Sequence, residues 1–264
     1  MISASKQTAA RRGPPPNLSL LEGAIERNGL HPFFQGKFSV ETGKVVGVEA
    51  LARIAGPQAD LAPAPYVELA ERTQRIDGLT LAMARTVARC VMDFNRVAPV
   101  QCAINISPMS LNRPEFARQV AMVINETGLE CEQFTLEVTE ASDAEYGPHA
   151  RATMLALRQQ GFGLAVDDFG AGTTNIDRLK DLPFTEVKID AAFTKLAMSE
   201  AYARTGIVNC VKIAKELGLK VTAKGIETQQ MWDFCKWLDV DEAQGFLLAR
   251  PLPPHEFKGL LEQG

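Results

Sequence analysis

The segment FFQGKFSVETGKVVGVEAL, residues 33–51, contains two runs typical of β-strands with a short turn between them. The first run is Phe33–Val40 and the second is Lys44–Leu51, and only Glu41-Thr42-Gly43 joins them. A parallel crossover needs about a dozen residues or more, so strands this close must pair as an antiparallel hairpin. A sheet that contains this segment therefore has one antiparallel strand.

The rest of the chain alternates short apolar runs with longer stretches of helical period. The further strands expected are Gln101–Ile106, Phe134–Thr139, Gly163–Asp168, Glu186–Ile189, Lys220–Ala223 and Glu242–Leu248. Between strands, Leu79–Arg96 and Phe116–Thr127 place apolar residues at helical spacing. Such alternation implies a mostly parallel sheet, and about eight strands in a chain of this length favour closure. The predicted fold class is α/β, a TIM-like (β/α)8 barrel with one antiparallel strand.

The composition is that of one globular domain preceded by a short tail. Of the 264 residues, 46% are hydrophobic and 23% are charged, which excludes disorder, collagen-like repeats and coiled coil for the chain as a whole. Residues 1–17 contain Arg11-Arg12 and Pro14-Pro15-Pro16 and too little apolar surface to offset the entropy of ordering, so we expect a flexible tail. Residues 18–264 are expected to form a single domain.

The net charge, the hydropathy pattern and the cysteines indicate which partners and metal ligands to expect. The net charge of −4 gives no global attraction for a nucleic acid polymer. Without an apolar run of about 18 residues or a signal sequence, we expect no membrane segment and a cytoplasmic location. The five cysteines form no C-x-x-C pair and are expected to be reduced, and the three histidines lack metal-binding spacing. Any metal is therefore expected on oxygen ligands.

Nearly every predicted strand ends in polar residues that directly follow apolar ones. These residues are Glu49, Asn105, Glu137, Asp167, Asp168, Lys188, Asp190, Lys224 and Gln244. Barrel enzymes carry their chemistry at the carboxyl ends of strands, so these side chains should converge on one mouth, although any single one could instead cap a helix. Four carboxylates and an amide in one cleft would repel unless cations neutralise them. The pattern therefore indicates Mg²⁺ or Mn²⁺.

The adjacent pair Asp167 and Asp168 suits two ions about 3.5–4 Å apart that clamp a phosphoryl group and activate water, which indicates phosphoester chemistry. Lys188 could contact a phosphate or the attacking water, or it could be a buried lysine paired with one of the acids. The Gly-bearing stretch Asp168–Asn175 could be a substrate-sensing lid or an ordinary turn between strand and helix.

These motifs resemble the EAL-domain family, the cyclic di-GMP phosphodiesterases, from about Leu18 to Leu261. The matching motifs, in family order, are Glu49-Ala50-Leu51 followed by Arg53, Asn105-Ile106-Ser107, Glu137-Val138-Thr139-Glu140, Asp167-Asp168-Phe169-Gly170, Val187-Lys188-Ile189-Asp190 and Ala243-Gln244-Gly245-Phe246. The resemblance implies a TIM-like barrel with one antiparallel strand. It also implies metal-dependent opening of cyclic di-GMP to linear pGpG.

The resemblance assigns roles to individual residues. It places one metal on Glu49, Asn105, Glu137 and Asp167, and a second on Asp167, Asp168 and a further Glu. Ligand contacts are implied for Gln35, Leu51, Arg53, Asp190 and Gln244; catalytic support for Glu49, Asp168, Lys188, Glu227 and Gln244; and loop anchoring for Glu140 and Thr174. The implied ion is Mg²⁺ or Mn²⁺, with Ca²⁺ as a non-productive substitute. Family members commonly form homodimers and are fused to sensory modules, so a homodimer and an upstream sensory module or protein partner are implied as well.

One departure from the family pattern has a chemical consequence. Where the family has A-E-G-[VI]-E, this chain has Ala223-Lys224-Gly225-Ile226-Glu227. A protonated ammonium has three donors and no lone pair, so Lys224 cannot be a metal ligand or, at its usual pKa, a base. We therefore predict a cyclic di-GMP-binding domain whose hydrolysis is weak or lost. Lys224 would stand partly in for the second cation as a fixed positive charge.

Three other interpretations stay open at this stage. Lys224 could swing to solvent while Glu227 or a water takes over its role, in an active metal-dependent phosphodiesterase. Barrel enzymes of the enolase type also carry strand-end carboxylates on Mg²⁺ with a lysine base, for which Lys188 or Lys224 would serve. The domain could also be a protein-interaction module that binds no nucleotide.

Overall fold

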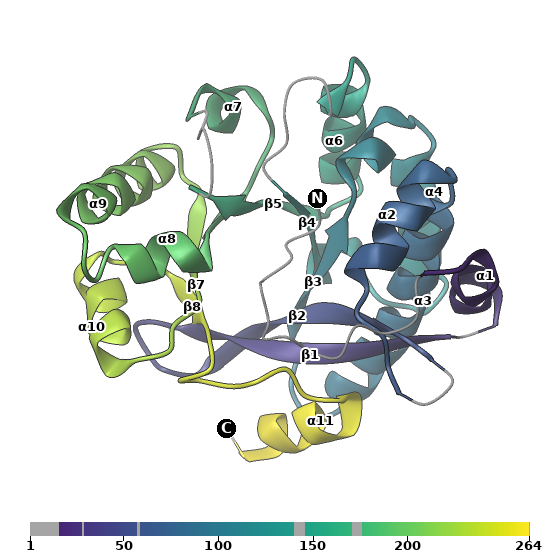
Figure 1. The fold of residues 1–264 in the computed structure, drawn as a ribbon, viewed down its shortest axis with the longest axis horizontal. Coiled ribbons are helices and arrows are strands. Elements are labelled where there is room, and N and C mark those ends of the chain that lie inside the picture. The colour runs from purple at the N-terminus through teal and green to yellow at the C-terminus, as the bar shows by residue number, and fades with distance from the viewer. Residues whose placement is uncertain (1–15, 28, 57–58, 140–145, 171–175, 264) are drawn as a thin grey trace.

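The structure, a computed structural model, describes residues 16–27, 29–56, 59–139, 146–170 and 176–263. Its eight strands close into a barrel in sequence order, and helices surround them (Figure 1). The strands are β1 Leu30–Ser39, β2 Val45–Ile54, β3 Gln101–Ile106, β4 Phe134–Thr139, β5 Gly163–Phe169, β6 Glu186–Ile189, β7 Lys220–Lys224 and β8 Glu242–Gln244. The predicted fold class is confirmed.

The first strand is antiparallel to both of its neighbours, as the short turn required. β1 pairs antiparallel with β2, where Gln35 faces Glu49, and antiparallel with β8, where Phe38 faces Ala243. The other neighbouring strands pair in parallel. Parallel strands end at the same edge, so the carboxyl ends of β2 to β8 form one mouth of the barrel.

The prediction for the last strand was wrong in its length, because the strand ends at Gln244 and not at Leu248. The chain turns at Gly245, where an added Cβ atom would lie 2.1 Å from the carbonyl oxygen of Ile226. The amide of Leu247 donates to that same oxygen at 3.0 Å. The close approach of these two backbones, which only glycine permits, ends the strand.

Helices follow most of the strands and bury their apolar faces against the barrel. They are α1 Leu18–Glu26, α2 Ala64–Arg72, α3 Ile76–Phe94, α4 Phe116–Asn125, α6 Ala150–Gln159, α7 Ile176–Asp181, α8 Ala191–Leu196, α9 Ala201–Glu216, α10 Gln229–Trp237 and α11 Pro254–Gln263, with 3₁₀ turns η1 Pro108–Asn112 and η2 Cys131–Gln133. Phe94 of α3 packs edge-to-face on Phe34 of β1 with ring centroids 4.9 Å apart, and Phe257 of α11 lies 5.2 Å from Phe94. These buried rings fix the hairpin to the helical layer.

Three further predictions concern the N-terminal tail, the cysteines and membrane segments. Of the predicted tail 1–17, residues 1–15 lie outside the described residues, and the side chain of Asn17 caps α1 by accepting a 2.9 Å hydrogen bond from the amide of Leu20. The five cysteines all lie in the described part of the chain, and none of them forms a disulfide. Within the described part of the chain, the helices are too short or too polar to cross a membrane.

Candidate functional site

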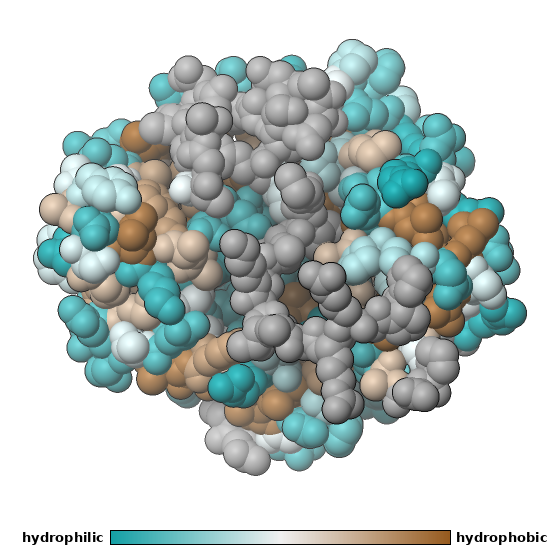
Figure 2. Space-filling view, viewed as in Figure 1, coloured by the Kyte–Doolittle hydropathy of each residue, from teal (hydrophilic) through white to brown (hydrophobic). Residues whose placement is uncertain are grey.

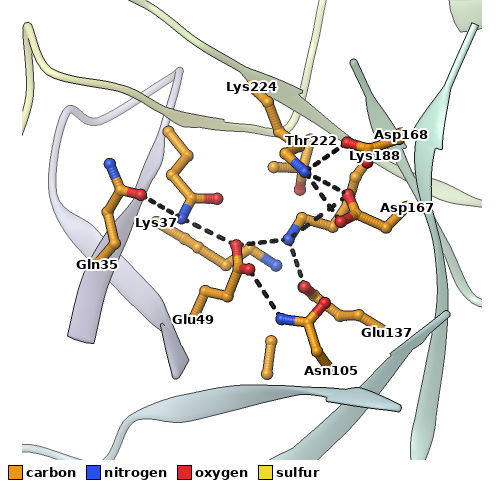
Figure 3. Close-up of polar contacts among 12 residues, drawn as sticks. Gln35, Lys37, Glu49, Asn105, Glu137, Asp167, Asp168, Lys188, Thr222 and Lys224 are labelled. Carbon is orange, nitrogen blue, oxygen red and sulfur yellow. Dashed lines mark hydrogen bonds and ion pairs between the residues drawn. The ribbon is translucent and has the colours of Figure 1, made fainter. Parts of the chain in front are cut away.

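Polar side chains from the ends of successive strands meet inside the mouth of the barrel (Figure 3). We call this group the mouth cluster and define it as Glu49, Asn105, Glu137, Asp167, Asp168, Lys188 and Lys224. Side chains alternate along a strand, which turns most of these residues inward while their neighbours face the helices. Asp168 directly follows Asp167 and departs from this alternation, since its φ of 55° is not that of a regular strand. The mouth cluster contains the metal-binding set that the sequence predicted, together with both strand-end lysines.

Lys188 bridges two of the carboxylates in the mouth cluster. Its buried Nζ donates to Glu49 Oε2 at 2.7 Å and to Glu137 Oε2 at 2.5 Å, and it lies 3.9 Å from Asp167 Oδ1. Burial opposes the charged ammonium, but the carboxylates of Glu137 and Glu49 outweigh it and raise the pKa of Lys188 well above its usual value. Of the two interpretations left open for Lys188, the structure shows the buried pairing.

Lys224 clamps the adjacent aspartates. Its Nζ donates to Asp167 Oδ1 and Oδ2 at 2.7 and 2.9 Å and to Asp168 Oδ1 at 2.8 Å. Asp168 has φ of 55°, a left-handed conformation that aspartate tolerates better than most residues. Burial would lower the pKa of Lys224, but the Asp167 carboxylate outweighs burial and raises it. The amine is therefore a fixed cation between the two aspartates.

Side-chain amides hold Glu49 in place from the other side. Asn105 Nδ2 donates to Glu49 Oε1 at 3.0 Å, and Gln244 Nε2 donates to Glu49 Oε2 at 3.0 Å. Gln244 also donates to Gln35 Oε1 at 3.1 Å, and Gln35 Nε2 donates to the carbonyl of Ala249 at 3.1 Å. Burial would raise the pKa of Glu49, but Lys188 and Lys224 outweigh it and hold that pKa well below its usual range.

Glu137 is the least satisfied member of the mouth cluster. It is fully buried, and its Oε1 has no hydrogen-bond partner. Burial, together with the nearby carboxylates of Glu49 and Asp167, raises the pKa of Glu137 to about 8 despite Lys188. Four carboxylates face two ammonium groups here, so the cluster carries an excess of two negative charges when all four are ionised. A buried carboxylate oxygen without a hydrogen-bond partner is stabilised when it binds a proton or a cation.

The donor set fits one hard divalent cation better than two. Glu49, Asn105, Glu137 and Asp167 supply carboxylate and amide oxygens, which are the ligands that Mg²⁺, Mn²⁺ and Ca²⁺ prefer, and the unpartnered Oε1 of Glu137 is one of them. The predicted second set combines Asp167 and Asp168 with position 224, and there the Lys224 ammonium has no lone pair for a metal and donates to both aspartates. Among the described residues, no three acidic, histidine or cysteine side chains are arranged as a ready metal-binding group.

Several predicted ligand contacts lie around this cluster. The Arg53 guanidinium donates to the carbonyl of Ala52 at 2.9 Å and lies 5.4 Å from the ring centroid of Phe33. Leu51 is half-buried on β2. Asp190 caps α8 by accepting a 3.0 Å hydrogen bond from the amide of Phe193, which is the structural role that strand-end aspartates often have.

Three further predicted residues lie outside the cluster or outside the described chain. Glu227 is half-exposed and its carboxylate lies 3.9 Å from Nζ of Lys195, so it is not joined to the mouth cluster. Glu140 and Thr174, the expected loop anchors, lie outside the described residues.

A second buried polar cluster at the opposite end of the barrel was missed by the sequence analysis. We call it the base cluster and define it as Lys37, Glu186, Lys220, Thr222 and Glu242. Lys37 Nζ lies 2.6 Å from Glu186 Oε1 and 2.9 Å from Glu242 Oε2, and Lys220 Nζ lies 3.0 and 2.9 Å from their other oxygens. Lys37 follows Gln35 by two positions on β1, so the alternation that turns Gln35 inward predicts the same for Lys37.

Comparison with known proteins identifies relatives along nearly the whole chain. The model of the EAL domain family matches residues 19–251. A cyclic di-GMP phosphodiesterase of Pseudomonas aeruginosa is 31% identical over 247 residues, which is 93% of this chain and 42% of that protein. The solved structure of the MucR phosphodiesterase of the same species in complex with cyclic di-GMP is 29% identical with a TM-score of 0.82, covering 91% of this chain and 98% of that one.

A calcium-containing relative is also similar. The complex of Klebsiella pneumoniae BlrP1 with calcium and cyclic di-GMP is 25% identical with a TM-score of 0.74, covering 86% of this chain and 56% of that one. The chain spans less than half the length of the first curated relatives, namely 42%, 30% and 29%.

Proposed function

The chain belongs to the EAL domain family, and on that premise we propose that it binds cyclic di-GMP at the mouth cluster and hydrolyses it weakly or not at all. The observation that carries the proposal is the contact of Lys224 Nζ with both aspartates, at 2.7–2.9 Å. These are the carboxylates that the family pattern assigns to the second metal ion.

Charge balance supports this role for Lys224. With glutamate at position 224, as in the family pattern, five carboxylates would face one ammonium, an excess of four negative charges that two divalent ions would neutralise. With lysine there, the excess is two, which one divalent ion neutralises. The substitution changes the charge by that of one divalent cation. Lys224 thus takes the electrostatic place of the second ion without supplying its chemistry.

The remaining residues retain what binding requires. Glu49, Asn105, Glu137 and Asp167 would hold one Mg²⁺ or Mn²⁺ ion, or Ca²⁺ without turnover, and a bound ion would supply Lewis-acid polarisation of a phosphoryl oxygen. Gln244 and Asn105 orient Glu49, and Lys188 neutralises Glu49 and Glu137. Lys224, protonated beside the two aspartates, cannot accept a proton from an attacking water. The site therefore keeps the residues that would position a metal ion and a phosphate, and it lacks one acid–base group.

The second candidate is a working phosphodiesterase. The complete first metal set favours it, and so does the similarity to cyclic di-GMP phosphodiesterases of Pseudomonas aeruginosa. It requires Lys224 to leave the aspartates, and the exposed Glu227, paired with Lys195, would then have to approach them. Family membership leaves the enolase-type interpretation without support, because the matched motifs contain the same strand-end carboxylates on which it relied.

A turnover assay separates the two candidates. Purified chain is incubated with cyclic di-GMP and Mg²⁺, Mn²⁺ or Ca²⁺, and pGpG formation is followed beside the Lys224→Glu variant. We expect little or no turnover by the unaltered chain and a gain of about 10²-fold or more in the variant, because a positioned acid–base group contributes about 10²–10⁴-fold. Lys212→Glu, the same charge change at an exposed site, is the control.

Two results of this assay would contradict the proposal. Turnover of about 1 s⁻¹ or faster by the unaltered chain, abolished by Glu49→Ala, would establish the working enzyme, since that rate is ordinary for enzymes. Absence of any cyclic di-GMP binding in calorimetry, with or without metal, would instead indicate a module that binds no nucleotide.

The oligomeric state and the partners are proposed from the family resemblance. We propose a homodimer that works with an upstream sensory module or a protein partner. The chain covers only 42%, 30% and 29% of the first relatives, so those relatives contain further segments in which such a module could lie. Five cysteines without a disulfide among them are typical of a reducing compartment, and we propose the cytoplasm. Size measurement in solution tests the dimer.

A further inference from the structure

The segment that leaves β8 borders the mouth of the barrel and is fixed at both ends. Gln244, the last residue of β8, donates to Glu49, and Gly245 packs directly on the backbone of Ile226. Five residues beyond Gln244, the carbonyl of Ala249 accepts a 3.1 Å hydrogen bond from the side chain of Gln35. The residues between these two anchors therefore have a defined place at the rim of the site.

Phe246 lies in this segment and is unusually exposed. Of the thirteen phenylalanines, all of them described, it is the only one in the exposed class, with 40% of its surface accessible. Figure 2 shows apolar surface along the lower edge of the molecule, over the yellow segment that joins β8 to α11 in Figure 1. The exposed Arg250 guanidinium lies 4.5 Å from the ring centroid. An aromatic face and an exposed guanidinium thus lie together at the rim of the mouth.

We propose that Phe246 is the stacking platform for one guanine base of cyclic di-GMP and that Arg250 reads the edge of that base. This inference rests on the proposed function. Nucleobases stack on exposed aromatic rings, and the arginine fork donates to the O6 and N7 acceptors of guanine. Adenine presents an amino donor in place of O6, so Arg250 would favour guanine. Phe246 and Arg250 then determine base specificity, while the mouth cluster binds the phosphates.

Calorimetric titration of the full chain with cyclic di-GMP and with cyclic di-AMP tests the proposal. Phe246→Leu keeps apolar bulk and removes the aromatic face, and we expect affinity for cyclic di-GMP to fall about 5- to 150-fold, from about 1–3 kcal/mol of stacking per base. Phe246→Tyr, which keeps the ring, should stay within about threefold of the unaltered chain. Arg250→Ala should reduce the preference for cyclic di-GMP over cyclic di-AMP by a similar factor of about 5–150.

Leu247→Ala is the matched control, since Leu247 is 41% exposed in the same turn, and its affinity should be unchanged. If Phe246→Leu binds cyclic di-GMP as tightly as the unaltered chain, the platform is refuted while the proposed function stands. If Leu247→Ala weakens binding as much as Phe246→Leu, the effect belongs to the turn and the platform is likewise refuted. Failure of the unaltered chain to bind cyclic di-GMP refutes the proposed function and the platform with it.

Discussion

At the base of the barrel two lysines meet two glutamates, whereas at the mouth two lysines meet four carboxylates. Every carboxylate oxygen of the base cluster lies within 3.0 Å of a lysine Nζ. At the mouth, Oε1 of Glu137 is buried without a hydrogen-bond partner. The base cluster is neutral and each of its carboxylate oxygens lies in an ion pair, although Oε2 of Glu186 makes no hydrogen bond. The mouth cluster has surplus negative charge.

The difference separates a structural ion cluster from a functional one within the same barrel. A buried ion pair is tolerated when its opposite charges are balanced and close together, which describes the base cluster. Surplus like charge in a buried site costs folding free energy, and its retention is typical of sites that bind a counter-charge. The mouth cluster therefore needs a ligand from solution to reach the balance that the base cluster has alone.

The largest effect is expected from breaking the base cluster. Lys37→Met leaves Glu186 and Glu242 with Lys220 as their lysine partner, and removing one partner of a buried pair costs about 3–5 kcal/mol. Guanidinium unfolding, read as the free energy of unfolding, measures the loss. Lys44→Met at an exposed position of the hairpin turn is the control and should change stability by less than about 0.5 kcal/mol. Equal losses in both variants would show that the base cluster contributes nothing specific.

A divalent cation should have the next largest effect, and it should act at the mouth. An ion that binds only the folded chain adds about 2.7 kcal/mol of stability at one hundred times its Kd. We expect this gain with Mg²⁺ or Mn²⁺ in the unaltered chain, and its loss in Asn105→Leu, which removes a predicted ligand. Lys220→Met at the base should retain the gain, because separate sites act additively. If the cation still stabilises Asn105→Leu but no longer stabilises Lys220→Met, the ion binds at the base cluster and the prediction is wrong.

The contrast between the two clusters also shows what the sequence reveals. The mouth was predictable because each of its residues follows an apolar run at the carboxyl end of a strand, and parallel strands bring those ends together. The hairpin was predictable because three residues cannot make a parallel crossover. The base cluster was missed because Glu186 and Glu242 begin their strands, where a charged residue usually faces solvent. Only the shared inward face of Gln35 and Lys37 could have indicated it.

The contacts of Lys224 were beyond sequence analysis for a different reason. The motif showed that an ammonium replaces a carboxylate, but the direction of a lysine side chain depends on its surroundings, and solvent was an open alternative. The positive φ of Asp168 brings that carboxylate beside Asp167, and the two aspartates together hold the amine. The end of β8 was mispredicted because the approach of Gly245 to Ile226 joins residues that are distant in sequence.

The smallest effect is a pH dependence that only the mouth should show between pH 5 and 8. The pKa of Glu137 is raised to about 8, so the folded chain holds this proton more tightly than the unfolded chain, and the associated stability is lost as pH rises from about 4.5 through 8. The pKa of Glu186 is lowered to about 2, because Lys37 and Lys220 outweigh its burial. Its contribution is therefore fully present above about pH 4.5 and is lost only toward pH 2.

Glu137→Gln removes the proton-linked loss and keeps the shape of the side chain. In metal-free buffer, its free energy of unfolding relative to the unaltered chain should rise by on the order of 2 kcal/mol between pH 5 and pH 8. Glu186→Gln should differ from the unaltered chain by the same amount at both pH values, which makes it the control. Saturating Mg²⁺ should shrink the pH effect in the unaltered chain, because the cation then takes the place of the proton on the carboxylates. If the free energy of unfolding changes with pH in the same way in Glu137→Gln and in the unaltered chain, the surplus charge of the mouth is already neutralised without a cation. The distinction between the two clusters would then fail.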